Sequence, residues 1–261
     1  MQLQLLKSYC YNQHNQPSQI PQLFHTYNQL WFKHLTGTCL QKAIAIARRL
    51  RNELGGGASI GLASQATFAA MLTKKAGVCS DYSQVFINFC ILNNIKVREW
   101  GVVDKWYNPR FGHSFNEIYC IQLKQWVAID VGKGVVFSTL TNNYRLLSVL
   151  ALRKYAGRYP HQLQFCSIAQ KNLAASTVQH LMHIYGLHVP YYFLVNRYNI
   201  YVMDKWLSRF SKPGLLQLAH LWVFLRGQYV QFMFLPRVSG FTARTALSAS
   251  VPNLRAQRTR L

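Results

Sequence analysis

Apolar residues recur at helical spacing in the N-terminal half of the chain and predict three helices. Within residues 31–54 they repeat every three or four positions, and the glycines at 55–57 end the pattern. A second helix is expected over residues 64–74. A third begins near residue 79, where an apolar stripe predicts a helix that faces a core and ends at two asparagines; the stripe consists of Tyr82, Val85, Phe86 and Phe89.

Three short segments rich in aromatic and β-branched residues follow and predict strands at 97–103, 114–121 and 126–131. Helices followed by neighbouring strands are typical of an α+β fold with an antiparallel sheet. By the period of two, His113 shares a face with Glu117, and Trp126 shares a face with Asp130. A hairpin turn centred at 121 and 122 would set His113 directly opposite Asp130, whereas a longer turn would shift that register.

The remaining segments give a weaker pattern. Residues 1–30 are rich in Gln and Asn and are expected to form an irregular lead-in, and residues 31–158 the core. A helix is expected over 141–155, a basic, aromatic-rich extension over 159–238, and a disordered tail over 239–261. Polar residues interrupt the apolar segment 215–235, which favours a core helix followed by a strand over a membrane span.

Positive charge is the unusual feature of the composition. The 261 residues include 29 Lys and Arg against 7 Asp and Glu, a formal net charge of +22. Only one acid, Asp204, lies after residue 130, so the C-terminal half is the more cationic half. This charge predicts an anionic partner such as nucleic acid, polysaccharide or a membrane surface, although the sequence contains no known nucleic-acid-binding motif.

Several other functions are disfavoured by the sequence. The N-terminus has no apolar run typical of a secretion signal, which favours a cytoplasmic location with reduced thiols. The six cysteines lack zinc-type spacing, and the glycines at 55–57 lack the Lys of a phosphate-binding loop. His180, His183 and His188 are interpreted as surface residues. Neither a metal nor a cofactor is therefore predicted.

Cys79, His113 and Asp130 carry the candidate chemistry. Taken alone, Cys79 would be a buried structural thiol. However, it is predicted to begin a helix behind Gly77, whose N-terminus favours the thiolate. Asp81 lies on a different face of that helix and is expected to help the helix start. An imidazole could take the proton of the thiol, and a carboxylate could hold the ring in its useful tautomer.

The segments GVCSDYSQVF, GHSFNEIY and QWVAID, which contain these three residues, resemble the signature of the transglutaminase-like superfamily. The resemblance covers roughly residues 60–155 and implies a papain-like core in which the helix carrying Cys packs on an antiparallel sheet carrying His and Asp. It implies that Cys79 is the nucleophile, His113 the general base and acid, and Asp130 the orienting carboxylate.

This chain departs from the family pattern at two points. Val-Gly-Lys follows Asp130 where many members have Pro-Thr. No tryptophan lies between Trp31 and Trp100, so no upstream indole is assigned as a donor to an oxyanion. The backbone N–H of Cys79 is the candidate donor on general grounds, because a helix N-terminus presents such groups to a developing oxyanion.

The sequence therefore predicts a thiol enzyme that acts on amide or other acyl bonds through a Cys79–His113–Asp130 triad and an acyl-enzyme. The enzyme could be a cysteine peptidase, an amidase or an acyl transferase, with a protein or peptide substrate. Hydrolysis and transfer to an amine both stay open. The alternative is a non-catalytic binding protein of the same fold, which would hold an anionic partner through its basic C-terminal half.

Overall fold

A computed structural model shows a mixed helical and antiparallel-sheet fold. It describes residues 17–60, 64–74, 76–104, 112–140, 145–169, 172–186, 191–195, 215, 218 and 231–232. The sheet has seven antiparallel strands in the order β5-β4-β3-β2-β1-β6-β7. Their bounds are β1 Val97–Val103, β2 Gly112–Cys120, β3 Gln125–Asp130, β4 Val135–Thr139, β5 Leu163–Ser167, β6 Tyr191–Val195 and β7 Gln231–Phe232.

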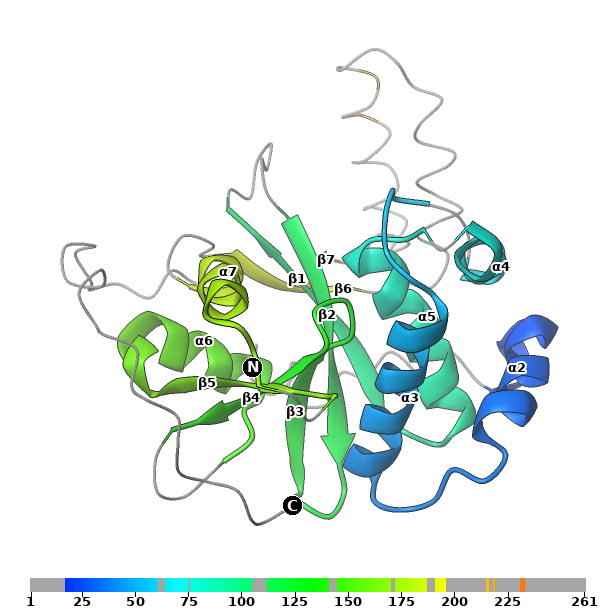
Figure 1. The fold of residues 1–261 in the computed structure, drawn as a ribbon, viewed down its shortest axis with the longest axis horizontal. Coiled ribbons are helices and arrows are strands. Elements are labelled where there is room, and N and C mark those ends of the chain that lie inside the picture. The colour runs from blue at the N-terminus through cyan, green and yellow to red at the C-terminus, as the bar shows by residue number, and fades with distance from the viewer. Residues whose placement is uncertain are drawn as a thin grey trace.

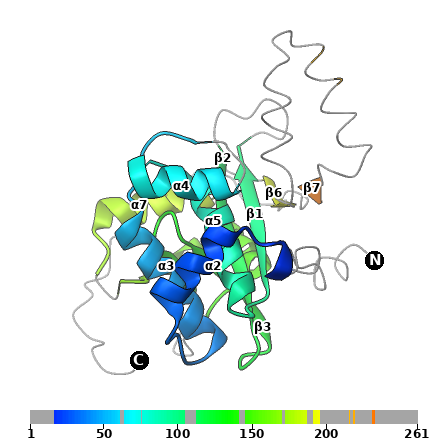
Figure 2. The same ribbon diagram turned by 90° about the vertical axis from the view of Figure 1, so that its right-hand side faces the viewer.

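Helices cover both faces of this sheet (Figure 1). The first layer lies in front of the sheet in Figure 2 and contains α2 Gln22–Phe32, α3 Cys39–Glu53, α4 Ser64–Lys74 and α5 Cys79–Leu92, with a short 3₁₀ turn at Pro17–Gln19 before them. The second layer contains α6 Val149–Arg158 and α7 Ala175–Tyr185, with a 3₁₀ turn at Pro160–Gln162 between them. The interior strand β1, which lies between β2 and β6, is accordingly buried along its whole length.

The alternation of side chains along the strands divides the interior into two hydrophobic cores. On β3, Val127 and Ile129 point into the core beneath α2–α5, whereas Ala128 points into the core beneath α6 and α7. Asp130 shares the face of Ala128, and His113 shares the face of Phe115, which also belongs to the second core. The imidazole and the carboxylate therefore lie on the face opposite to the layer that contains Cys79.

The secondary structure predicted for residues 64–131 is confirmed. The helices over 64–74 and from residue 79 are α4 and α5, and the three predicted strands are β1, β2 and β3 with ends shifted by at most two residues. The α+β class is also confirmed. α2, β4, β5, α7 and β6 were not predicted as elements.

The helix predicted over 141–155 was placed too early. Residues 141–144 lie outside the described residues, and residues 145–147 bond to strands instead: Thr139 N–H donates to Arg145 O at 3.1 Å and Ala128 N–H donates to Leu147 O at 2.8 Å. The helix begins only after Ser148, whose side chain caps it by accepting from Ala151 N–H at 3.2 Å. Sheet pairing outweighed local helix propensity here.

Two predicted domain boundaries are also wrong for the described residues. The helix α2 begins at Gln22, inside the segment 1–30 that was expected to be irregular, and continues to Phe32; its Phe24 is fully buried in the first core. Beyond residue 158, β5, α7 and β6 belong to the same sheet and cores as the preceding elements. The core of the fold therefore continues into the predicted basic extension.

Most of the C-terminal half of that extension lies outside the described residues, as does the whole predicted tail 239–261. Within the apolar segment 215–235, Leu215 and Leu218 are helical but 51% and 64% exposed, so these two residues do not support the predicted core helix. Gln231–Phe232 form the short strand β7. Among the described residues, no helix combines the length and apolar character needed to cross a lipid bilayer.

The register of the β2–β3 hairpin differs from the prediction by two residues. Cys120 pairs with Gln125 and Asn116 with Ile129, so residues 121–124 form the turn. Continuing this register sets Asp130 opposite Phe115 instead of opposite His113. Because a shift by two residues keeps every side chain on its face, His113 still lies diagonally across from Asp130 and within reach of it.

Candidate active site

The first turn of α5 holds Cys79 in place through its backbone. Gly77 has φ +126°, a conformation that other residues rarely adopt, and a β-carbon there would lie 2.8 Å from Met71 Cε. Asp81 is fully buried, and its Oδ2 accepts hydrogen bonds from Val78 N–H at 3.0 Å and Ile60 N–H at 3.1 Å. Asp81 therefore helps to start the helix, as expected, and ties it to the preceding loop.

His113 and Asp130 form a buried pair at the ends of two neighbouring strands. The Nε2 atom of His113, in β2, lies 2.7 Å from Oδ2 of Asp130, the last residue of β3. His113 is 7% exposed and Asp130 is fully buried. Because Nε2 faces the carboxylate, the other ring nitrogen, Nδ1, is left to meet the thiol.

Cys79 completes this arrangement from the other helical layer. Its half-buried thiol hydrogen-bonds with the His113 ring and with the backbone N–H of Ser114. Gly132 lies directly against Cys79, since a β-carbon on Gly132 would be 3.4 Å from Cys79 Cα. The structure thus brings together all three residues that the sequence singled out, at the end of the sheet where the two layers meet.

The electrostatics of this group favour a thiolate beside an imidazolium. Burial alone would raise the pKa of Cys79, but the hydrogen bond and positive charge of His113 lower it below its usual value. Burial alone would lower the pKa of His113, but the charge of Asp130 and the hydrogen bond to it raise this pKa to about 10. At neutral pH the imidazole is therefore protonated.

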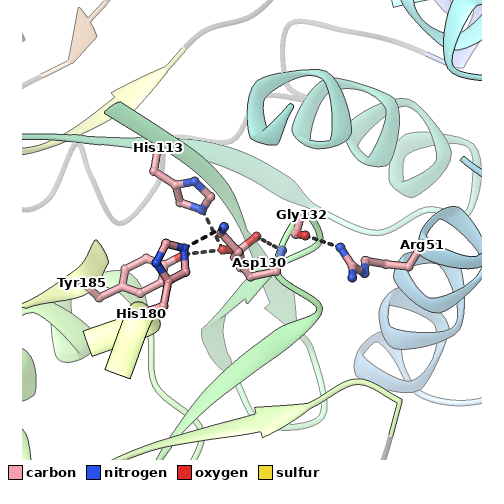
Figure 3. A network of polar contacts seen from close by, with 7 residues as sticks. Arg51, His113, Asp130, Gly132, His180 and Tyr185 are labelled. Atoms are coloured by element: carbon pink, nitrogen blue, oxygen red, sulfur yellow. Dashed lines mark hydrogen bonds and ion pairs between the residues drawn. The ribbon is translucent and has the colours of Figure 1, made fainter. Parts of the chain in front are cut away.

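Asp130 keeps its charge although it is fully buried. Burial opposes ionisation, but the charge of His113 outweighs it and lowers the pKa of Asp130. Tyr185 Oη donates to Oδ2 at 2.5 Å, and Lys133 N–H donates to Oδ1 at 2.8 Å (Figure 3). The adjoining turn is anchored from the first layer by Arg51, which donates to the carbonyl of Gly132 (Figure 3).

His180, on α7, lies beside this network without joining the triad. Its Nε2 is 3.1 Å from Lys133 Nζ, and partial burial together with the charge of Lys133 lowers the pKa of His180 (Figure 3). His180 and His183 are exposed, whereas His188 lies outside the described residues. Within the described ranges no three His, Cys, Asp or Glu side chains are grouped to hold a metal ion.

The other thiols have different surroundings. Cys90 and Cys120 are buried, Cys39 and Cys166 are half-exposed like Cys79, and Cys10 lies outside the described residues. None of the five described cysteines forms a disulfide bond. Cys39 and Cys166 therefore provide internal references for the reactivity of Cys79.

Sequence reasoning missed the residues that surround the triad. Tyr185 is 55 positions from Asp130, on a helix that was not predicted, and its sequence context carries no sign of the contact. Arg51 lies on a predicted helix, but nothing in its spacing indicates that it reaches the turn after β3. The glycine at 132, by contrast, follows the predicted strand end and could have suggested a close approach.

Comparisons with known proteins identify no family for this chain. No family model matches the sequence, and no curated protein matches it. A solved structure of a protein provisionally named a cysteine protease, from Cytophaga hutchinsonii, is similar over 50% of this chain and 42% of its own, with 23% identity and a TM-score of 0.34. The match therefore spans less than half of that protein.

Proposed function

We propose that this protein is a cysteine-dependent enzyme that acts on amide or related acyl bonds through a transglutaminase-like triad. The observation that carries this proposal is the series of hydrogen bonds from a half-buried thiol through His113 to the buried Asp130. A structural thiol needs no such partners. The lowered pKa of Cys79 and the raised pKa of His113 are what a thiolate nucleophile requires.

In the proposed reaction, the thiolate of Cys79 attacks the carbonyl carbon of the substrate. The S–C bond forms and the carbonyl π electrons move onto oxygen, giving a tetrahedral oxyanion. No hydrogen bond within the described residues uses the backbone N–H of Cys79, so this group at the helix N-terminus could donate to the oxyanion. As the oxyanion collapses, the bond to the leaving amine breaks and His113 gives that amine its proton.

The resulting acyl-enzyme is resolved by a second nucleophile. His113, now neutral, removes a proton from water or from an incoming amine, which attacks the thioester carbonyl. Collapse of the second tetrahedral intermediate releases the thiolate and restores the imidazolium. Asp130 stays charged throughout and orients the ring. Water gives hydrolysis and an amine gives transfer.

Two measurements on the full chain test this proposal. Limited treatment with iodoacetamide at pH 7, followed by peptide mapping, should label Cys79 faster than Cys39 and Cys166. p-Nitrophenyl acetate should release one burst of nitrophenolate and leave an acetyl group on Cys79. Cys79→Ser is the matched control and should give no burst. Equal labelling of the three thiols, or a burst that survives in Cys79→Ser, would contradict the proposal.

A binding role for an anionic polymer or membrane is the second candidate, favoured by the net charge of +22. It would not need the thiol, so Cys79→Ser should bind heparin or phosphatidylserine vesicles as wild type does. Binding should weaken steeply as salt is raised. No binding of either probe at low salt would remove this candidate.

A further inference from the structure

Tyr185 is the last residue of α7 and lies at the centre of the second core. Its hydroxyl reaches the same Asp130 oxygen that His113 contacts, with Oη 2.5 Å and Nε2 2.7 Å from Oδ2. Tyr185 is only 1% exposed. A buried tyrosine hydroxyl needs a hydrogen-bond partner, but a neutral carbonyl would satisfy it equally well.

The hydroxyl is a donor in this contact. Burial and the charge of Asp130 raise the pKa of Tyr185 well above its usual value, so the phenol keeps its proton. The carboxylate has no proton to give, because the pKa of Asp130 is lowered. Tyr185 therefore donates, and Asp130 accepts three hydrogen bonds, two on Oδ2 and one on Oδ1.

The three donors fix the rotation of the carboxylate. Lys133 N–H holds Oδ1, and Tyr185 holds Oδ2 where it faces His113. Without the hydroxyl, Oδ2 would keep only its bond to His113, and one side of a buried carboxylate would lack a donor. The orientation of the carboxylate in turn fixes the orientation of the imidazole that contacts the thiol.

The tyrosine ring is itself held on several sides. It packs edge-on against His113, with centroids 5.9 Å apart, and against Phe115 and Phe137 at 5.1 Å and 4.8 Å. Tyr192 Oη donates to the carbonyl of Tyr185 at 3.0 Å, a backbone contact that is separate from this ring packing. Ring packing thus places the hydroxyl independently of its bond to Asp130.

We propose that Tyr185 is a positioning residue that aligns the Asp130 carboxylate with His113 and thereby with Cys79. The effect of Tyr185 on catalysis rests on the proposed function, whereas the alignment of the carboxylate does not depend on turnover. The hydroxyl provides this alignment. The ring packs in the core with or without the hydroxyl.

Tyr185→Phe removes only the hydroxyl, and Tyr192→Phe is the matched control. Both changes delete one buried hydroxyl at the same helix end, but only the first touches Asp130. In ¹⁵N-histidine-labelled protein, the ring N–H between His113 and Asp130 should give a far-downfield proton signal, identified by its absence in His113→Asn. This signal should be displaced or broadened in Tyr185→Phe and unchanged in Tyr192→Phe.

The same variants are then compared in acetylation of Cys79 by p-nitrophenyl acetate. Tyr185→Phe should slow the burst about tenfold, the effect expected for one hydrogen bond to a charged group, whereas Tyr192→Phe should stay close to wild type. In an Asp130→Asn background, adding Tyr185→Phe should have little further effect, because the tyrosine hydroxyl acts through the carboxylate.

The outcomes separate the two proposals. An unchanged signal in Tyr185→Phe, an equal change in Tyr192→Phe, or absence of the signal from wild type would overturn the positioning role. A signal that is displaced only in Tyr185→Phe, in a protein whose Cys79 is never acetylated, would support the positioning role and contradict the proposed enzyme.

Discussion

Two buried carboxylates on neighbouring strands of one sheet show what separates a structural ion pair from a candidate catalytic one. Glu117, on β2, accepts from Arg98 Nε at 2.6 Å, from Trp100 Nε1 at 2.8 Å and from Val149 N–H at 2.7 Å. Asp130, on β3, also accepts three hydrogen bonds. Both carboxylates are fully buried and face the same core.

The partners of the two carboxylates differ. Arg98 carries a planar guanidinium, is 2% exposed and packs against Trp126 with 3.8 Å from Cζ to the ring centroid. Through Glu117 it holds the N-terminus of α6 on the sheet. His113 can lose its proton, and its second nitrogen meets a half-buried thiol. The two carboxylates thus accept the same number of hydrogen bonds but serve different purposes. Only Asp130 has a partner, His113, that can titrate beside a thiol, and this marks the candidate site.

The largest effect should come from breaking the structural pair. Arg98→Met leaves Glu117 as an unpaired buried charge and should lower the free energy of unfolding by about 3–5 kcal/mol. Urea denaturation measures this change. Arg98→Met/Glu117→Leu should recover most of the loss, and labelling of Cys79 in the folded protein should stay near the wild-type rate. A large loss of labelling in folded Arg98→Met would show that the two pairs are not separate.

Breaking the second pair should affect reactivity more than stability. A thiol with an ordinary pKa of about 8.5 is only about 3% ionised at pH 7, so His113→Asn should slow iodoacetamide labelling of Cys79, by up to about thirtyfold. Peptide mapping measures the rate, and Cys166 in the same molecule is the control. A rate that falls equally at Cys166 would point to a general change in the fold.

The two pairs should also differ in their response to alkali. The folded-state pKa of His113, about 10, lies above its unfolded value near 6.5, so its stabilisation is complete below pH 6.5 and is lost as pH rises towards 10. The stability difference between wild type and His113→Asn should shrink by more than about 1 kcal/mol over this range.

Arg98→Met/Glu117→Leu provides the control for this titration. Because it removes the carboxylate together with the guanidinium, no unpaired buried acid is left to titrate, and the stability difference between wild type and this variant should stay nearly constant over the same range. Urea denaturation at several pH values measures both differences. Parallel curves for the two variants would contradict the assignment of the proton to His113.

The smallest effect is expected at the glycine that separates Asp130 from Cys79. In Gly132→Ala, the new β-carbon would lie 3.4 Å from both Asp130 Oδ1 and Cys79 Cα, a close but tolerable contact. Labelling of Cys79 should change less than about threefold, because ordinary van der Waals contact requires little movement. Gly132→Val should change the labelling rate of Cys79 more than Gly132→Ala does. Equal rates in both variants would show that the turn has more room than the structure indicates.

The sequence by itself determined the local features of the site. Apolar periodicity predicted α4, α5 and the three central strands, because side chains return to the same face every 3.6 residues in a helix and every two residues in a strand. The glycine at 77 and the position of Cys79 at a helix start were likewise local signals. The period of two placed His113 and Asp130 within reach even though the predicted register was two residues off.

Only the tertiary structure decided which distant residues complete these features. The late start of α6, the pairing of β4 and β5, and the contact between Tyr185 and Asp130 all depend on segments far apart in the chain. The sequence also does not distinguish Glu117 from Asp130, because each is one of the few acids and lies on a predicted strand. Their roles differ because packing gave one an arginine and the other a histidine beside a thiol, and such long-range contacts leave no period in the sequence.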